Sequence, residues 1–112
     1  VVRVPERWID AVTAVSGSGP AYFFYWMEQM IEAGMALGLS AKVAKSLVLQ
    51  TALGAARLAE ESKGNLRELR AKVTSKGGTT EAALRLFTQR HLGETIRQGI
   101  QAAARRAKQL GG

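Results

Sequence analysis

Five consecutive aromatic residues, Tyr22-Phe23-Phe24-Tyr25-Trp26, lie in a segment that has the pattern of a helix. Neighbouring positions on a helix are about 100° apart, so these rings point all round the axis rather than along one stripe. A helix that is apolar on most faces is buried on most faces. A chain of 112 residues offers few places for this, so a ligand pocket or a second chain must cover the helix. We favour a second chain, because aromatic residues are enriched at protein interfaces.

Helix start and stop signals divide the rest of the chain. The expected helices span approximately residues 5–12, 18–37, 40–61, 65–72, 80–90 and 94–110. The signals are Pro5, Ser18 with Pro20, Gly38, Ser40, Asn65 with Glu68, and Gly93. Only Val1–Val4 shows the alternation of a strand. We therefore predict an all-α fold of about five to six helices.

The third expected helix is rich in small residues, among them Ala44, Ala52 and Gly54-Ala55-Ala56. Small side chains let two helices approach closely, which favours packing and not chemistry.

Composition limits the class of protein. The apolar fraction of 46% and charged fraction of 22% are typical of a soluble globular chain, and the length predicts one domain over residues 1–112. There is no cysteine, and the single histidine, His91, excludes a polyhistidine metal site within one chain. We expect no metal, no membrane span and a cytoplasmic location. Because the chain begins at Val1 without an initiator methionine, we expect a segment of a longer protein.

The net charge of +7 raises the question of a nucleic-acid partner. The basic residues are spread along the chain, and only Arg105, Arg106 and Lys108 cluster, without interleaved aromatics. A basic helical nucleic-acid-binding module therefore stays an alternative, but we expect no nucleic acid to be bound.

The loop Lys72–Thr80 is the best candidate for binding a ligand. Paired glycines allow a sharp turn that brings N–H groups near a bound molecule, and a helix start favours an anion. The hydroxyls come from Ser75, Thr79 and Thr80, and the N–H groups from Gly77, Gly78 and Thr79. Such a set can hold a small carboxylate. The alternative is a capped turn in a dimerisation module with no ligand.

No acid–base pair is evident beside this loop. Glu81 is accounted for by the helix dipole in a first turn, and His91 lies near the end of its expected helix. A nucleophilic serine would need a base that the sequence does not supply. Binding and orientation are therefore favoured over hydrolysis.

Three blocks of the sequence resemble the signatures of pyrroline-5-carboxylate reductases. They are Asp10–Tyr22 (DAVTAVSGSGPAY), Gln50–Ala56 (QTALGAA) and Val73–Leu84 (VTSKGGTTEAAL). The resemblance covers about Val4 to Leu110 and is confined to the C-terminal helical dimerisation domain of that family. No dinucleotide fingerprint occurs in the chain.

The resemblance implies reduction of 1-pyrroline-5-carboxylate to L-proline by NADPH or NADH, the last step of proline biosynthesis. The cofactor would be bound by an N-terminal Rossmann domain of either subunit, and no residue of this chain is expected to bind it. The chain alone is expected to be inactive. In that family the helical domains of two subunits interlock, so the resemblance also implies that the expected helices 18–37 and 40–61 form the core of a homodimer, with a higher oligomer left open.

The resemblance also implies roles for the loop residues. Ser75 and the backbone of Gly77, Gly78 and Thr79 would take the substrate carboxylate. The hydroxyl of Thr80 would face the imine nitrogen, as the catalytic residue of this chain. Hydride transfer depends chiefly on orientation, so a binding loop without a catalytic pair suffices.

One residue departs from the family pattern. Lys76 stands where the family usually has proline. Proline would fix φ and stiffen the loop, whereas lysine loosens it and adds a positive charge near an anionic substrate.

Overall fold

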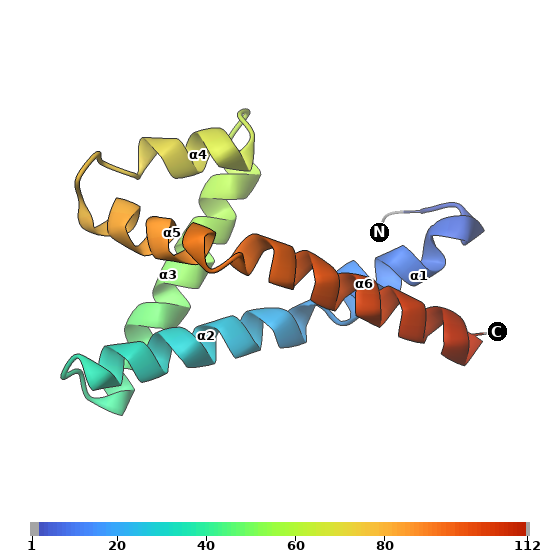
Figure 1. Cartoon of the computed structure of the whole chain (residues 1–112), viewed down its shortest axis with the longest axis horizontal. Helices are drawn as coiled ribbons and strands as arrows, with labels where there is room; N and C mark the ends of the chain where they lie inside the picture. The colour runs from blue at the N-terminus through green and yellow to red at the C-terminus, as the bar shows by residue number, and fades with distance from the viewer. Residues whose placement is uncertain (1–2, 112) are drawn as a thin grey trace. The chain divides into compact units, whose positions relative to one another are not determined.

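The computed structural model describes residues 3–111, which form a helical fold (Figure 1). In chain order the elements are η1 (Glu6–Trp8), α1 (Ile9–Val12), η2 (Thr13–Gly17), α2 (Gly19–Ala36), α3 (Ala41–Glu61), α4 (Leu66–Lys72), α5 (Thr79–Gln89) and α6 (Leu92–Gly111). No strand occurs within residues 3–111, which confirms the all-α prediction. Of the strand-like Val1–Val4, the first two residues lie outside the described residues, and the other two have no regular structure.

The helices divide into two compact units. The first unit is Val1–Phe24 with Phe87–Gly112, and the second is Tyr25–Leu86. Both α2 and α5 contribute residues to each unit. A single domain over residues 1–112 stays a prediction.

In the first unit, α6 packs against η2 and α1 (Figure 1). Element η2 is a π-helical turn, in which the Ser18 N–H donates to the Thr13 carbonyl at 2.9 Å. The wider turn also releases the carbonyl of the buried Ala14, which accepts from the Tyr22 hydroxyl at 2.7 Å. The predicted end of the first helix near Val12 matches the end of α1, but the π-turn, which was not predicted, continues the helical backbone to Gly17.

The end of α2 is a Schellman motif. The N–H of Leu39 donates to the Gly34 carbonyl at 3.0 Å, and the N–H of Gly38 donates to the Met35 carbonyl at 3.0 Å. Gly38 has φ +109°, a conformation that glycine adopts without a Cβ clash. The predicted stop at Gly38 is confirmed.

Helices α2 and α3 approach closely at Gly34. A Cβ built on this glycine would lie 3.3 Å from Leu39 Cδ1 and 3.4 Å from Ala44 Cβ. Ala44 and Val48 are the buried residues of α3. The predicted N-cap is also present, since the Ser40 hydroxyl accepts from the Val43 N–H at 3.2 Å. The second unit therefore has its small core along this seam.

Helix α4 begins as predicted at a cap formed by Asn65 and Glu68. The Asn65 Oδ1 atom accepts from the Glu68 N–H at 2.9 Å, and Asn65 Nδ2 donates to Glu68 Oε1 at 3.4 Å. This satisfies one of the free N–H groups of the first turn and holds the Glu68 side chain over it.

The predicted break at Gly93 was wrong. Helix α5 ends at Gln89, His91 adopts φ 57°, and Gly93 lies inside α6. The His91 carbonyl accepts from both the N–H and the hydroxyl of Thr95, each at 3.1 Å. These bonds begin α6 at the histidine. Ile96 of α6 is 47% exposed in the single chain.

The buried apolar core of the described residues is small and comprises Ala14, Ala44 and Val48. Many large apolar side chains are exposed instead. On α2 and α3 they include Phe23, Phe24, Tyr25, Met35, Val43, Leu47, Leu49, Leu53 and Leu58. The aromatic segment that the sequence marked as needing cover is thus largely uncovered within the single chain.

Candidate functional site

The candidate loop connects α4 to α5 and lies in the second unit. Its first residues close the end of α4. The N–H groups of Val73 and Thr74 donate to the carbonyls of Arg70 and Ala71, at 3.3 and 3.2 Å. The Thr74 hydroxyl donates to the Arg70 carbonyl. Thr74 therefore serves the helix end, and the hydroxyls available to a ligand come from the other loop residues.

The centre of the loop is a β-turn from Ser75 to Gly78. The Gly78 N–H donates to the Ser75 carbonyl at 3.0 Å, and Gly77 has φ +76°. A positive φ at the third residue is the mark of a type II turn, which favours glycine there. Lys76 then occupies the second position, where proline is common. The glycine pair shapes the turn as the sequence predicted.

Helix α5 begins at Thr79, immediately after this turn. The Gly78 carbonyl accepts from the Ala82 N–H at 3.2 Å, so Gly78 is the N-cap. Among the described residues, the N–H groups of Thr79 and Thr80 have no acceptor. Both side chains are exposed, as is that of Ser75. Hydroxyls and free N–H groups therefore meet at the positive end of a helix dipole.

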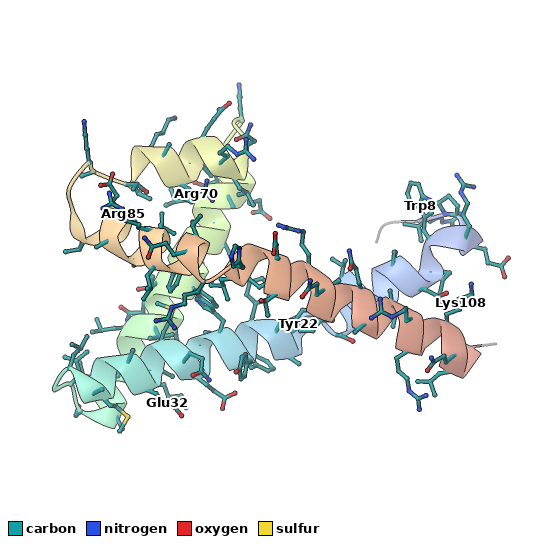
Figure 2. All side chains as sticks on the ribbon, in the orientation of Figure 1. Trp8, Tyr22, Glu32, Arg70, Arg85 and Lys108 are labelled. Atoms are coloured by element: carbon teal, nitrogen blue, oxygen red, sulfur yellow. The ribbon has the colours of Figure 1, made fainter. Side chains whose placement is uncertain are left out.

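Glu81 makes a contact that the sequence interpretation missed. Its Oε1 atom accepts from the Gly77 N–H at 3.1 Å and from Arg85 Nη2 at 3.1 Å. Figure 2 labels Arg85 on α5 and Arg70 on α4, the helices that flank the loop. The spacing could have revealed this contact, since a glutamate at the third helical position commonly reaches back over the helix start. The N–H groups of Gly77 and Gly78, both assigned to a ligand, are therefore engaged within the chain.

The other candidate residues do not join this loop into a catalytic set. His91 is exposed, and its Nδ1 atom lies 3.8 Å from Glu94 Oε2. Within the described residues, no three side chains of the metal-binding kinds come together. The same residues include no helix that is both long and apolar enough to cross a membrane.

The sequence matches the family model for pyrroline-5-carboxylate reductase dimerisation over residues 6–110. The chain belongs to this family of dimerisation domains. It is 52% identical over 105 residues to the pyrroline-5-carboxylate reductase of Pseudomonas aeruginosa, covering 94% of this chain and 38% of that protein.

Solved structures agree with this assignment. The pyrroline carboxylate reductase of Plasmodium falciparum, solved with NADP bound, has a TM-score of 0.94 and 33% identity, covering 97% of this chain and 42% of that one. The pyrroline-5-carboxylate reductase of Coxiella burnetii has a TM-score of 0.91 and 44% identity, with coverage of 96% and 40%. The chain thus spans about two fifths of the length of the reductases that it resembles.

Proposed function

We propose that this chain is the dimerisation and substrate-binding part of a pyrroline-5-carboxylate reductase, which reduces 1-pyrroline-5-carboxylate to L-proline in proline biosynthesis. The membership of the chain in the dimerisation family supports this proposal. The observation that carries it furthest is the polar turn at the start of α5, which offers hydroxyls and free N–H groups at the positive end of a helix.

The loop from Ser75 to Thr80 holds the substrate in this proposal. The hydroxyls and N–H groups of the loop bind the carboxylate, and the Thr80 hydroxyl faces the ring nitrogen. Both Ser75 and Thr80 are exposed in the single chain, so a ligand can reach them. The contribution of the chain is to bind and orient the imine, which is the main requirement for a hydride transfer.

The hydride donor in this proposal is NADPH or NADH, bound outside the described residues. A dinucleotide is commonly bound where a strand turns through a glycine-rich loop into a helix. Residues 3–111 contain no strand, so they do not fit that cofactor. An N-terminal Rossmann domain of the full-length protein supplies this part of the site.

The homodimer is supported by the surface of the chain. Its accessible area is 9625 Å² for 12.0 kDa, whereas a compact monomer of that mass has about 6000 Å². Two separate compact units of half the mass would together expose about 7200 Å². The accessible area beyond that of these compact forms is of the size that obligate dimers bury. We also propose that the protein is cytoplasmic and that it binds neither nucleic acid nor a membrane.

The proposal is tested with the full-length protein that carries this chain. We expect oxidation of NADPH or NADH that depends on 1-pyrroline-5-carboxylate, and none from the 112-residue chain alone. Replacing Thr80 by valine removes the hydroxyl at nearly constant shape, and should lower kcat/KM by about 10- to 100-fold. Thr80→Ser should keep most of the activity.

Thr88→Val is the matched control, because Thr88 is exposed on the same helix, eight positions further on. If Thr80→Val turned over the imine as fast as the wild type does, Thr80 would not be part of the site. Turnover by the 112-residue chain alone would contradict the division of the enzyme into two parts. A wild-type protein that neither turns over the imine nor binds L-proline would be a dimerisation module without a ligand.

A further inference from the structure

Both glycine N–H groups of the loop are engaged within the chain. The Gly78 N–H donates to the Ser75 carbonyl, and the Gly77 N–H donates to Glu81 Oε1 at 3.1 Å. The first bond closes the turn, and the second links the turn to the first turn of α5. Neither N–H is therefore offered to a ligand in this conformation. The N–H groups of Thr79 and Thr80, by contrast, have no acceptor among residues 3–111.

The position of Glu81 in α5 explains why it can accept from the Gly77 N–H. With Gly78 as the N-cap, Glu81 is the third residue of α5, from which a glutamate reaches back over the helix start. Its side chain is 32% exposed and shares its Oε1 atom with Arg85, at 3.1 Å. The arginine orients the carboxylate and offsets its charge. A substrate carboxylate at Gly77 would find the N–H already bonded to Glu81, and the negative charge of Glu81 would repel it.

We propose that Glu81 is a positioning residue of the substrate loop. By holding the Gly77 N–H, its carboxylate fixes the turn, so that the substrate carboxylate is bound by the Thr79 and Thr80 N–H groups and the loop hydroxyls. This inference rests on the proposed function, and it reassigns the glycine pair from ligand binding to shaping the loop. Glu81 does not touch the reacting atoms and acts through the geometry of the turn.

The test compares Glu81→Ala with Glu81→Gln in the full-length reductase. Glu81→Ala removes the acceptor of the Gly77 N–H, and we expect KM for the imine to rise about tenfold while kcat changes little. Glutamine keeps an oxygen that can accept from Gly77, so Glu81→Gln should restore most of the affinity. The same order is expected for inhibition by L-proline.

Glu68→Ala is the matched control. Glu68 is also the third residue of its helix, α4, and it contacts the cap residue Asn65 rather than the substrate loop. We expect its KM to equal that of the wild type. A general loss of stability would affect both variants, whereas a positioning role raises KM in Glu81→Ala alone.

Each other outcome overturns the inference. An unchanged KM in Glu81→Ala would show that the contact does not shape the site, and a lowered KM would show that the substrate displaces Glu81 from Gly77. A Glu81→Gln variant as weak as Glu81→Ala would assign the effect to charge instead of the hydrogen bond. If the wild type shows no turnover, the proposed function fails together with this inference. If the wild type is active and one of the outcomes above is found, only this inference fails.

Discussion

Lys76 occupies the second position of the Ser75–Gly78 turn, next to a glycine with φ +76°. The residue at this position of a type II turn has φ near −60°, which is the value that a proline ring imposes. Lysine loses conformational entropy when it adopts this turn. Proline would lose less, because its ring already restricts the unfolded chain. The side chain is exposed, so its charge is free to face solvent or an anion.

Lys76→Pro should therefore stabilise the protein. We expect the free energy of unfolding to rise by about 0.4–1 kcal/mol, because the substitution restricts the unfolded chain and not the folded turn. The measurement is urea denaturation at a fixed protein concentration. Lys76→Ala removes the charge without adding a ring, and it should leave the stability close to that of the wild type. Destabilisation by proline would mean that the turn does not hold this residue at φ near −60°.

At the scale of the helices, Gly34 sets the distance between α2 and α3. It ends α2 through the bond to Leu39, and its missing Cβ leaves room for the Leu39 side chain and for Ala44, which is 1% exposed. Small residues at such a crossing let the two backbones approach. A larger side chain must push the helices apart or force strained rotamers.

Gly34→Val should destabilise the protein by about 1–3 kcal/mol through overpacking of this seam. Thermal unfolding followed by circular dichroism measures the change. Gly93→Val is the control, because a Cβ there would meet only the end of the Arg97 side chain, at 3.4 Å. Equal effects of the two variants would show that the loss comes from valine in a helix and not from the seam.

The helix ends show what the sequence could predict. Caps with a local mechanism were predictable, as at Ser40, Asn65 and Gly38, since the capping group lies within three or four residues of its partner. The break at His91 was missed because glycine is the usual left-handed residue, and the sequence offered Gly93 two positions later. The π-turn at Thr13–Gly17 was not predicted, and it packs against α6, which lies far along the chain.

The loop also has features that were predicted from the sequence and one that was missed. Its turn and its helix start could be predicted from the glycine pair and the threonines. The Gly77–Glu81 bond was missed although the spacing allows it, because the helix dipole alone already explains a glutamate in the first turn. The substrate and the residue roles came from the resemblance to a family, and they stay proposals.

At the scale of the whole molecule, the small core requires a partner. The buried apolar residues among residues 3–111, which are Ala14, Ala44 and Val48, cannot offset the conformational entropy of a chain of this length. In the proposed homodimer, a second copy that covers the exposed faces of α2 and α3 would supply the missing burial. Folding and dimerisation are then one step, so the unfolding temperature should rise with protein concentration.

Phe24→Glu tests this coupling on the aromatic segment. Phe24 is 61% exposed in the single chain, and a charge on a free surface changes stability by only about 0.5 kcal/mol. In a dimer interface the same charge is buried without a partner, which costs several kcal/mol, so we expect loss of both the dimer and the helical signal. Sedimentation velocity and circular dichroism measure the two losses. Gln29→Glu adds the same charge at an exposed polar position of α2 and should leave the dimer intact. A folded monomer, in either the wild type or Phe24→Glu, would contradict the argument, because it would show that the single chain reaches stability with its aromatic face in water.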